Sequence, residues 1–172
     1  GRYYGEGLPI YTFYMPKYAG IEVDTGLPMW YAEKDGQTVV TTAYSEASNY
    51  LCGDPTPDVY GGFGTSMVLG AFDISMQFSY SVGGLVYDSG YASLMSPPGT
   101  STGTNIHRNM LFAWTPENKE APIPRFQYLD ENIAAQSDRF LTDASFLNFQ
   151  SAQVGYTLPR SLTERFNVSR MR

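Results

Sequence analysis

The residue types that most often carry out chemistry are sparse in this sequence. His107 is the one histidine and Cys52 is the one cysteine. An acid–base or nucleophilic site needs a second group within hydrogen-bond reach, and the sequence places no convincing partner for either residue. We therefore expect His107 to pack against, or lie on, a short loop helix. Cys52 can form no internal disulfide, and we expect it to pack as a small apolar group or to lie in a loop.

The acidic residues and the one glycine-rich run also have non-catalytic interpretations. Residues 61–64 read GGFG, but no helix is predicted after them, which argues against a phosphate-binding loop. Three acidic pairs are expected to be solvated or to cap turns: Asp54/Asp58, Asp130/Glu131 and Asp138/Asp143. We therefore expect no enzyme, no cofactor and no metal site.

The composition restricts the class of protein. The 172 residues suffice for one ordinary domain, and aromatic residues make up 15% of them. Charged residues make up only 16%, below the soluble average of about 25%. The net charge of −6, with no cluster of lysine and arginine, argues against nucleic-acid binding. No apolar run reaches the roughly 18 residues of a transmembrane helix.

The most regular stretch of the sequence predicts the element that would position any functional residues. From residue 72 to residue 82, apolar and polar side chains alternate without exception. This period of two predicts a strand with one apolar face and one polar face. Its length matches the roughly 9–11 residues of a tilted membrane-crossing strand rather than the usual 5–6 of a soluble strand. A tight turn at 69–71 and a second β-compatible run at 60–69 complete a predicted hairpin.

Shorter elements are expected on either side of this hairpin. Residues 11–18 favour a strand that Pro16 interrupts, and 28–32 with 38–42 predict a small hairpin. A further strand, at 145–158, changes its alternation near Gln150, which predicts a β-bulge. Two short helices are expected: one over 105–113, capped by Thr104 and with Ile106 and Met110 on one face, and one that begins at Pro159, with Leu162 and Phe166 on one face.

The connections between these elements are unequal in length. The turn at Gly70 is minimal, whereas 21–58 and 83–143 are long. Outer-membrane barrels show this asymmetry, with short periplasmic turns and long extracellular loops. It predicts that strand 60–69 runs inward, 72–82 outward and 145–158 inward. A last β-like piece at 168–172 leads us to expect a segment of a longer protein.

Four short sequence motifs resemble those of a known family and occur in the same order as in that family. Residues 56–66 with 72–75 (TPDVYGGFGTS and FDIS) and 137–147 with 154–159 (SDRFLTDASFL and VGYTLP) resemble two motifs of the SusC/RagA family. Shorter words at 18–21 (YAGI) and 114–118 (WTPEN) fit the same family. The family consists of TonB-linked outer-membrane transporters of Bacteroidetes.

The resemblance implies an all-β fold, in which antiparallel strands belong to a large transmembrane barrel of about 22 strands. Residues 1–172 would be part of its C-terminal half, with long extracellular loops, short loop helices and the plug domain absent from this chain. The family imports glycans or peptides across the cell outer membrane, beneath a SusD-like surface lipoprotein lid, with energy that TonB transmits through the plug. Where family members carry an acidic, calcium-loop-like motif, residues 33–37 read EKDGQ, so no metal is expected.

The aromatic residues then acquire expected roles. The apolar face of 72–82 should contact outer-membrane lipid through Phe72, Ile74, Met76, Phe78 and Tyr80. Trp30, Tyr31 and Trp114 lie in the predicted outer loops, where they are candidate contacts for the substrate or the lid. Tyrosines near strand ends are candidates for the membrane-interface girdle: Tyr60, Tyr80, Tyr87 and Tyr156.

Two alternatives remain open at this point. A small self-contained outer-membrane barrel of about eight strands would suit the length, although too few full-length strands are visible. A soluble β-sandwich that binds carbohydrate would use Trp30 and Trp114 as flat platforms.

Overall fold

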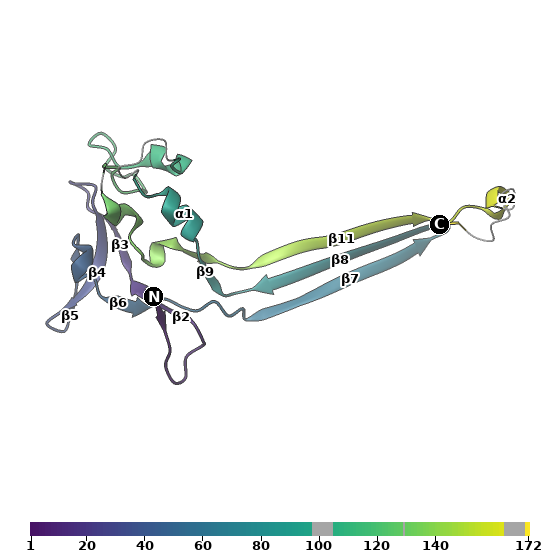
Figure 1. Cartoon of the computed structure of the whole chain (residues 1–172), viewed down its shortest axis with the longest axis horizontal. Helices are drawn as coiled ribbons and strands as arrows, with labels where there is room; N and C mark the ends of the chain where they lie inside the picture. The colour runs from purple at the N-terminus through teal and green to yellow at the C-terminus, as the bar shows by residue number, and fades with distance from the viewer. Residues whose placement is uncertain (98–104, 129, 164–170) are drawn as a thin grey trace. The chain divides into compact units, whose positions relative to one another are not determined.

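The computed structural model describes residues 1–97, 105–128, 130–163 and 171–172. It divides into unit 1, Gly1–Thr56 with Leu85–Asp143, and unit 2, Pro57–Gly84 with Ala144–Arg172. Strands predominate in both units and the helices are short (Figure 1). In the described part of the chain, no helix has the length and apolar character needed to cross a bilayer.

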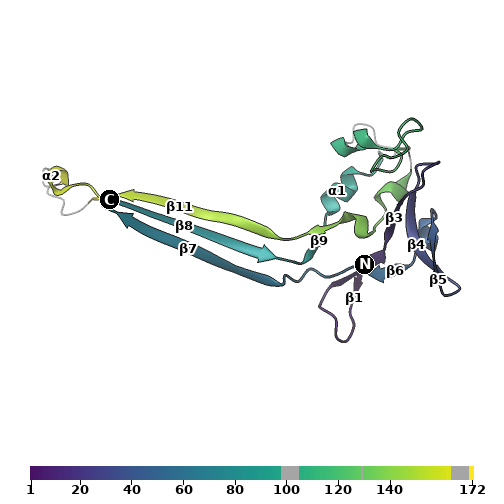
Figure 2. The same cartoon turned by 180° about the vertical axis from the view of Figure 1, so that it is seen from behind.

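Unit 2 is built on three long antiparallel strands. They are β7 (Val59–Leu69), β8 (Phe72–Val82) and β11 (Phe146–Tyr156), in the order β11-β8-β7. The three strands lie side by side in Figures 1 and 2. Leu69 pairs with Phe72, which leaves a two-residue turn whose first central residue, Gly70, has φ 62°. A positive φ at that position is what a type II′ hairpin turn requires, and glycine adopts it without steric penalty. The predicted hairpin is confirmed.

The predicted bulge in β11 is also confirmed. The register against β8 shifts between Phe149 and Ser151, so Gln150 is the extra residue. The shift returns Ala152, Val154 and Tyr156 to the face that Leu147 and Phe149 occupy. Helix α2 follows at Arg160–Thr163, and Phe166 of the predicted apolar pair lies outside the described residues. The predicted β-like piece at 168–172 is described only at its last two residues.

The described residues of unit 1 form three small sheets. Strands β3 (Tyr18–Ile21), β4 (Pro28–Lys34) and β5 (Gln37–Thr41) form one of them. Asp35 (φ 54°) and Gly36 (φ 75°) join β4 to β5, and two positive φ values in succession are characteristic of the type I′ hairpin turn. The hairpin expected from 28–32 and 38–42 is therefore confirmed, with both strands shifted or extended by a few residues.

The other two sheets involve shorter strands. Strands β1 (Arg2–Tyr3), β2 (Thr12–Pro16) and β6 (Asn49–Leu51) pair in the order β1-β2-β6. Strand β2 ends at Pro16 because proline has no N–H to continue the ladder, as the sequence predicted. The third sheet pairs β9 (Leu85–Tyr87) with β10 (Leu141–Asp143).

The helices of unit 1 are one or two turns long. They are η1 (Tyr44–Glu46), α1 (Ser89–Leu94), η2 (Arg108–Phe112), η3 (Glu131–Ala134) and η4 (Asp138–Phe140).

The helix expected over 105–113 is shorter than predicted, because it is the 3-10 helix η2. Its N-cap is His107, so Ile106 precedes the helix and is exposed while Met110 is buried. The predicted shared face of these two residues is therefore wrong, and Thr104 lies outside the described residues.

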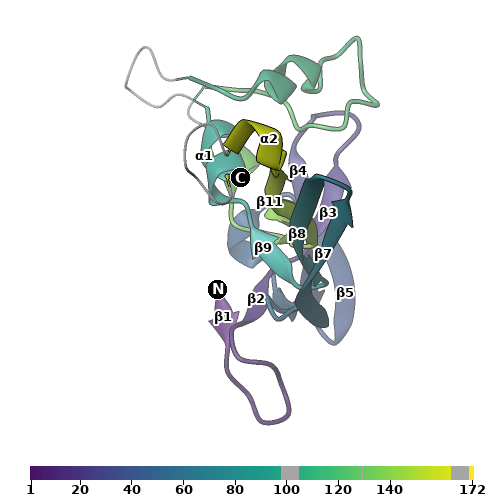
Figure 3. The same cartoon turned by 90° about the vertical axis from the view of Figure 1, so that its right-hand side faces the viewer.

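Two sets of apolar residues are buried in unit 1. One cluster joins α1, η2 and η4 through Met95, Met110 and Phe140, with Ile123 and Ile133 beside them. A second buried set comes from β2 and β4 and includes Phe13, Met15 and Trp30. Figure 3 shows the strands of unit 1 and the loop between β1 and β2, which projects away from them.

Candidate functional site

One face of the unit 2 sheet is apolar across all three strands. Residues that pair directly in an antiparallel sheet lie on the same face. Phe78 of β8 therefore shares a face with Phe63 of β7 and Phe149 of β11. The alternate positions that make up this face are Val59, Gly61, Phe63, Thr65, Met67 and Leu69 of β7, Phe72, Ile74, Met76, Phe78, Tyr80 and Val82 of β8, and Leu147, Phe149, Ala152, Val154 and Tyr156 of β11.

Aromatic rings form rows across this face. Phe63 stacks on Phe78 with ring centroids 4.9 Å apart, and Phe78 lies 5.2 Å from Phe149. At the turn end of the sheet, Phe72 lies 4.7 Å from Tyr156. Val154 remains 70% exposed, so the face has no cover from the described residues of unit 2. A wide uncovered apolar face of this kind marks a surface that contacts protein or membrane.

The opposite face of the sheet is polar and nearly uncharged. Ser75, Gln77 and Ser79 of β8 pair with Ser66, Gly64 and Gly62 of β7. Tyr60, Val68 and Phe146 are its apolar exceptions, near the strand ends. A hairpin with one apolar and one polar face suits a barrel wall between lipid and a polar lumen.

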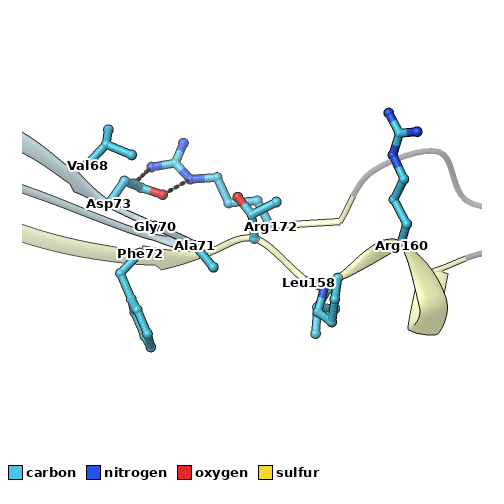
Figure 4. A pocket seen from close by; sticks show the side chains of 10 residues that line it. Val68, Gly70, Ala71, Phe72, Asp73, Leu158, Arg160 and Arg172 are labelled. Atoms are coloured by element: carbon cyan, nitrogen blue, oxygen red, sulfur yellow. Dashed lines mark hydrogen bonds and ion pairs between the residues drawn. The ribbon is translucent and has the colours of Figure 1, made fainter.

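The one ion pair of this face, among the described residues, lies at the turn end. Arg172 binds the Asp73 carboxylate in bidentate fashion, with Nε donating to Oδ1 at 2.9 Å and the terminal nitrogen donating to Oδ2. Figure 4 shows Asp73 and Val68 on one side of the sheet and Phe72 on the other. Gly155, opposite Asp73, leaves room for the pair, because a Cβ there would lie 2.5 Å from the carboxylate oxygen. The ion pair and the glycine therefore form one packing unit.

Trp30 lies in β4 of unit 1 and is only 1% exposed. Its ring packs edge-on against Tyr44 with centroids 5.1 Å apart. The contact role expected for Trp30 does not fit this burial, because the indole has no free face to offer a substrate or a lid. Its Nε1 is buried without a hydrogen-bond partner among the described residues.

Trp114 and Tyr31 are half-buried. The Trp114 ring lies directly on Gly26, where an added Cβ would come within 2.5 Å of the ring, and its Nε1 donates to the Val23 carbonyl at 3.0 Å. Arg125 continues this contact, since its backbone N–H donates to the Gly26 carbonyl at 2.8 Å. Trp114 therefore holds its loop to the β3–β4 turn. Only the exposed part of its ring and Tyr31 remain as candidate contacts for the substrate or the lid.

The four tyrosines proposed for an interface girdle have different environments. Tyr80 and Tyr156 lie on the apolar face, whereas Tyr60 pairs with Ser81 on the polar face. Tyr87 belongs to unit 1, where its ring lies 6.1 Å from Phe140 and packs against the apolar cluster. The girdle role for Tyr60 and Tyr87 does not fit these positions.

Asp138 and Arg139 are adjacent charged residues of unit 1 whose pKa values are both shifted by burial. Asp138 accepts a hydrogen bond from the Tyr18 backbone N–H at 2.7 Å, across 120 residues of sequence. Burial raises the pKa of Asp138, and that hydrogen bond opposes the shift. Burial also lowers the pKa of Arg139, whose guanidinium lies 5.2 Å from the Tyr18 ring centre and donates to the Ile133 carbonyl. Asp138 is thus a structural acceptor rather than the solvated residue that the sequence suggested.

The remaining chemistry-bearing residues have structural roles. His107 Nδ1 accepts from the Asn109 N–H at the start of η2, and its ring packs on Tyr91. Asp54 caps a turn through Thr56 N–H and Asp130 caps η3 through Asn132 N–H. Cys52 is free and half-buried, and burial raises the pKa of its thiol. No group of residues within the described ranges could hold a metal ion.

The loop between β1 and β2 has a backbone conformation that no motif in the sequence predicts. Tyr11 has φ 66°, a left-handed conformation that costs a non-glycine residue about 1–3 kcal/mol. The surrounding contacts hold it there. Arg2 donates to the Tyr11 carbonyl at 2.7 Å, and the Tyr4 ring lies edge-on at 5.7 Å. The sequence feature that could have pointed to this loop is its tyrosine content, because four of the 14 tyrosines fall in the first 14 residues.

Comparison with known proteins identifies relatives among transporters and receptors. No family model matches the sequence. The chain is 27% identical to TonB-dependent receptor P3 of Formosa agariphila, over 97% of its own length and 17% of that receptor.

Two solved structures have the same fold in the region they share with the chain. A chain of the RagAB peptide transporter matches 88% of this chain at 28% identity and a TM-score of 0.67, and 17% of that chain is covered. The RagAB peptide importer in its open-open state gives 28% identity, a TM-score of 0.69 and 16% coverage. The protein thus spans about a sixth of the length of the relatives that it matches. These relatives are named as a receptor and transport proteins. The resemblance that the motifs carry is therefore confirmed, and the chain is SusC/RagA-like.

Proposed function

We propose that this chain forms part of the barrel wall and outer loops of a TonB-dependent transporter in the outer membrane of a Bacteroidetes-type bacterium. The observation that carries the proposal is the unit 2 sheet, with an uncovered apolar face on one side and a polar, nearly uncharged face on the other. Lipid would cover the first face and the barrel lumen would lie along the second.

In this arrangement the Gly70 turn lies on the periplasmic side. Strand β7 runs inward, β8 runs outward and β11 runs inward, since the turns on the periplasmic side of such barrels are short. Phe72, Ile74, Met76, Phe78 and Tyr80 contact lipid, and the segments of unit 1 belong to the extracellular loops. The barrel has about 22 strands, of which this chain supplies a C-terminal portion.

The imported nutrient is a peptide or an oligosaccharide, and a SusD-like lipoprotein covers the barrel as a lid. The two solved relatives are named as a peptide transporter and a peptide importer, which favours a peptide. TonB acts through a plug supplied by the rest of the protein. Tyr31 and the free part of Trp114 are the candidate contacts for the substrate or the lid.

The test uses the full-length protein, co-expressed with its lipoprotein in a strain that lacks the native pair. Uptake of a fluorescent peptide and of a fluorescent oligosaccharide is measured with and without TonB. We expect TonB-dependent uptake of one of them by the unmodified protein. Ile74→Arg should lower the denaturant concentration at which the heat-modifiable folded form is lost, while the matched change Ser75→Arg on the polar face should leave that concentration nearly unchanged. TonB-independent uptake, or the reverse order of the two variants, would exclude the proposed arrangement.

A further inference from the structure

The loop between β1 and β2 of unit 1 carries two hollows that share one carboxylate. One, of about 390 Å³, is lined by Tyr4, Glu6 and Ile10, and the other, of about 370 Å³, by Tyr3, Glu6 and Tyr14. Both lie near the lower end of the range of about 300–1,000 Å³ for ligand pockets, so each suits a single side chain better than a protein domain. We call residues 3–14 the tyrosine loop.

Glu6 is the one charged residue that lines either hollow. Within the described residues, no hydrogen bond or ion pair engages its carboxylate. The nearby cation, Arg2, is already engaged, because it donates to the Tyr11 carbonyl at 2.7 Å and its guanidinium lies 3.9 Å from the centre of the Phe13 ring. The described residues therefore leave the Glu6 carboxylate available to an external cation.

Aromatic side chains line the same two hollows as Glu6. Tyr4 is 66% exposed and Tyr11 53%, and the two rings pack edge-on. Tyr3 packs against Tyr14 at 5.4 Å, and a Cβ on Gly5 would come within 2.7 Å of the Tyr3 ring. The loop backbone therefore runs directly over the Tyr3 ring at the residue that precedes Glu6.

A carboxylate beside exposed aromatic faces recognises a cation on an apolar stem. The carboxylate pairs with the charge, the ring faces attract it through cation–π interaction, and the stem packs on the rings. A neutral oligosaccharide offers no such charge. We propose that the tyrosine loop binds the lysine or arginine side chain of a peptide. This rests on the proposed function for its setting, and it narrows the substrate class to peptides with a basic residue.

The experiment measures binding to the full-length transporter purified with its lipoprotein. The probes are a short fluorescent peptide with a central lysine and the same peptide with norleucine, which keeps the stem and removes the charge. Glu6→Gln should weaken binding of the lysine peptide by about fivefold and leave the norleucine peptide unchanged. Asp35→Asn removes a charge from another exposed turn of unit 1 and should change neither affinity by more than about twofold.

Salt provides a second measurement. Raising it from about 50 to 500 mM should weaken binding of the lysine peptide alone, because screening acts on exposed charges. Equal loss of both peptides in Glu6→Gln, or no loss of either, would overturn the assignment. Binding of the lysine peptide that depends on Glu6, without TonB-dependent uptake, would contradict only the proposed function. Binding of an oligosaccharide and of neither peptide would refute the tyrosine loop while leaving transport intact.

Discussion

In unit 1 one set of large apolar side chains packs into a buried core, whereas in unit 2 the large apolar side chains form rows across three strands with their outer surfaces uncovered. Phe13, Met15 and Trp30 are almost completely buried in unit 1. Phe63, Phe72 and Phe149 of unit 2 are each at least half exposed. Phenylalanine and methionine occur both in the buried set of unit 1 and on the apolar face of unit 2, so residue type alone does not account for the difference.

The difference lies in the backbone. The long strands of unit 2 hold a period of two over eleven residues, which places every second side chain on one side of the sheet. The short strands and turns of unit 1 change direction often, and its apolar residues meet across loops. Unit 1 therefore forms its own core, while unit 2 requires an apolar environment from outside. The predictions below test this contrast, from the largest expected effect to the smallest.

The largest effect is expected from Trp30→Ala, which should cost about 3–5 kcal/mol because it leaves a cavity in a packed site. Amide hydrogen exchange in the full-length protein should then rise across β3, β4 and β5. The matched change Phe149→Ala in unit 2 should cost about 1–2 kcal/mol and leave β8 and β11 protected, because half of that ring contacts no protein. If exchange in β4 stayed unchanged, Trp30 would not be a core residue and its expected contact role would return.

The next prediction compares an arginine substitution on the apolar face of unit 2 with one on its polar face. Ile74→Arg should cost about 2–4 kcal/mol and Ser75→Arg about 0–1 kcal/mol, because only the first places a charge in lipid. The free energy of unfolding in lipid vesicles, measured by denaturant titration, compares the two variants directly. An equal loss in both would mean that neither face contacts lipid.

A smaller effect tests the packing of Trp114. Gly26→Ala should cost about 1–3 kcal/mol, since φ is +72° and the new Cβ would meet the indole ring. Gly36→Ala has a similar φ of +75° with open space around it, so it measures the backbone strain alone. The difference between their unfolding free energies gives the contribution of the ring contact. Equal losses would place Trp114 away from the β3–β4 turn.

The smallest effect concerns pH. Because burial raises the pKa of Asp138 in the folded protein, the folded state holds its proton more tightly than the unfolded state. The local stabilisation is complete below the ordinary aspartate pKa of about 4 and is lost as the pH rises through the raised value. Protection of the slowest-exchanging amides of unit 1, corrected for intrinsic exchange, should therefore increase as the pH falls through this window. Asp138→Asn should remove that dependence, and an unchanged dependence would assign it to another group.

The parts of the fold that could be predicted are those encoded by neighbouring residues. The alternation of 72–82, the Gly70 turn and the bulge at Gln150 each depend on a few adjacent side chains or on one backbone angle. The hairpin over β4 and β5 follows in the same way from Asp35 and Gly36. Short 3-10 helices were predicted less well, because a single turn such as η2 has little periodicity and depends on its contacts.

The sequence by itself determined the two-faced sheet of unit 2, because the alternation of side chains is a local property that any extended strand must express. The motifs that resemble the SusC/RagA family indicated the kind of protein to which such a sheet belongs. Tertiary structure alone decided that Trp30 is buried, that Trp114 packs on Gly26 and that Asp138 accepts from Tyr18. Each of these outcomes depends on loops from distant parts of the chain meeting, as the 120-residue separation of Asp138 and Tyr18 illustrates. The tyrosine loop depends on both local sequence and tertiary contacts. Its tyrosines are close together in the sequence, but the left-handed conformation of Tyr11 is maintained by the contacts that surround it.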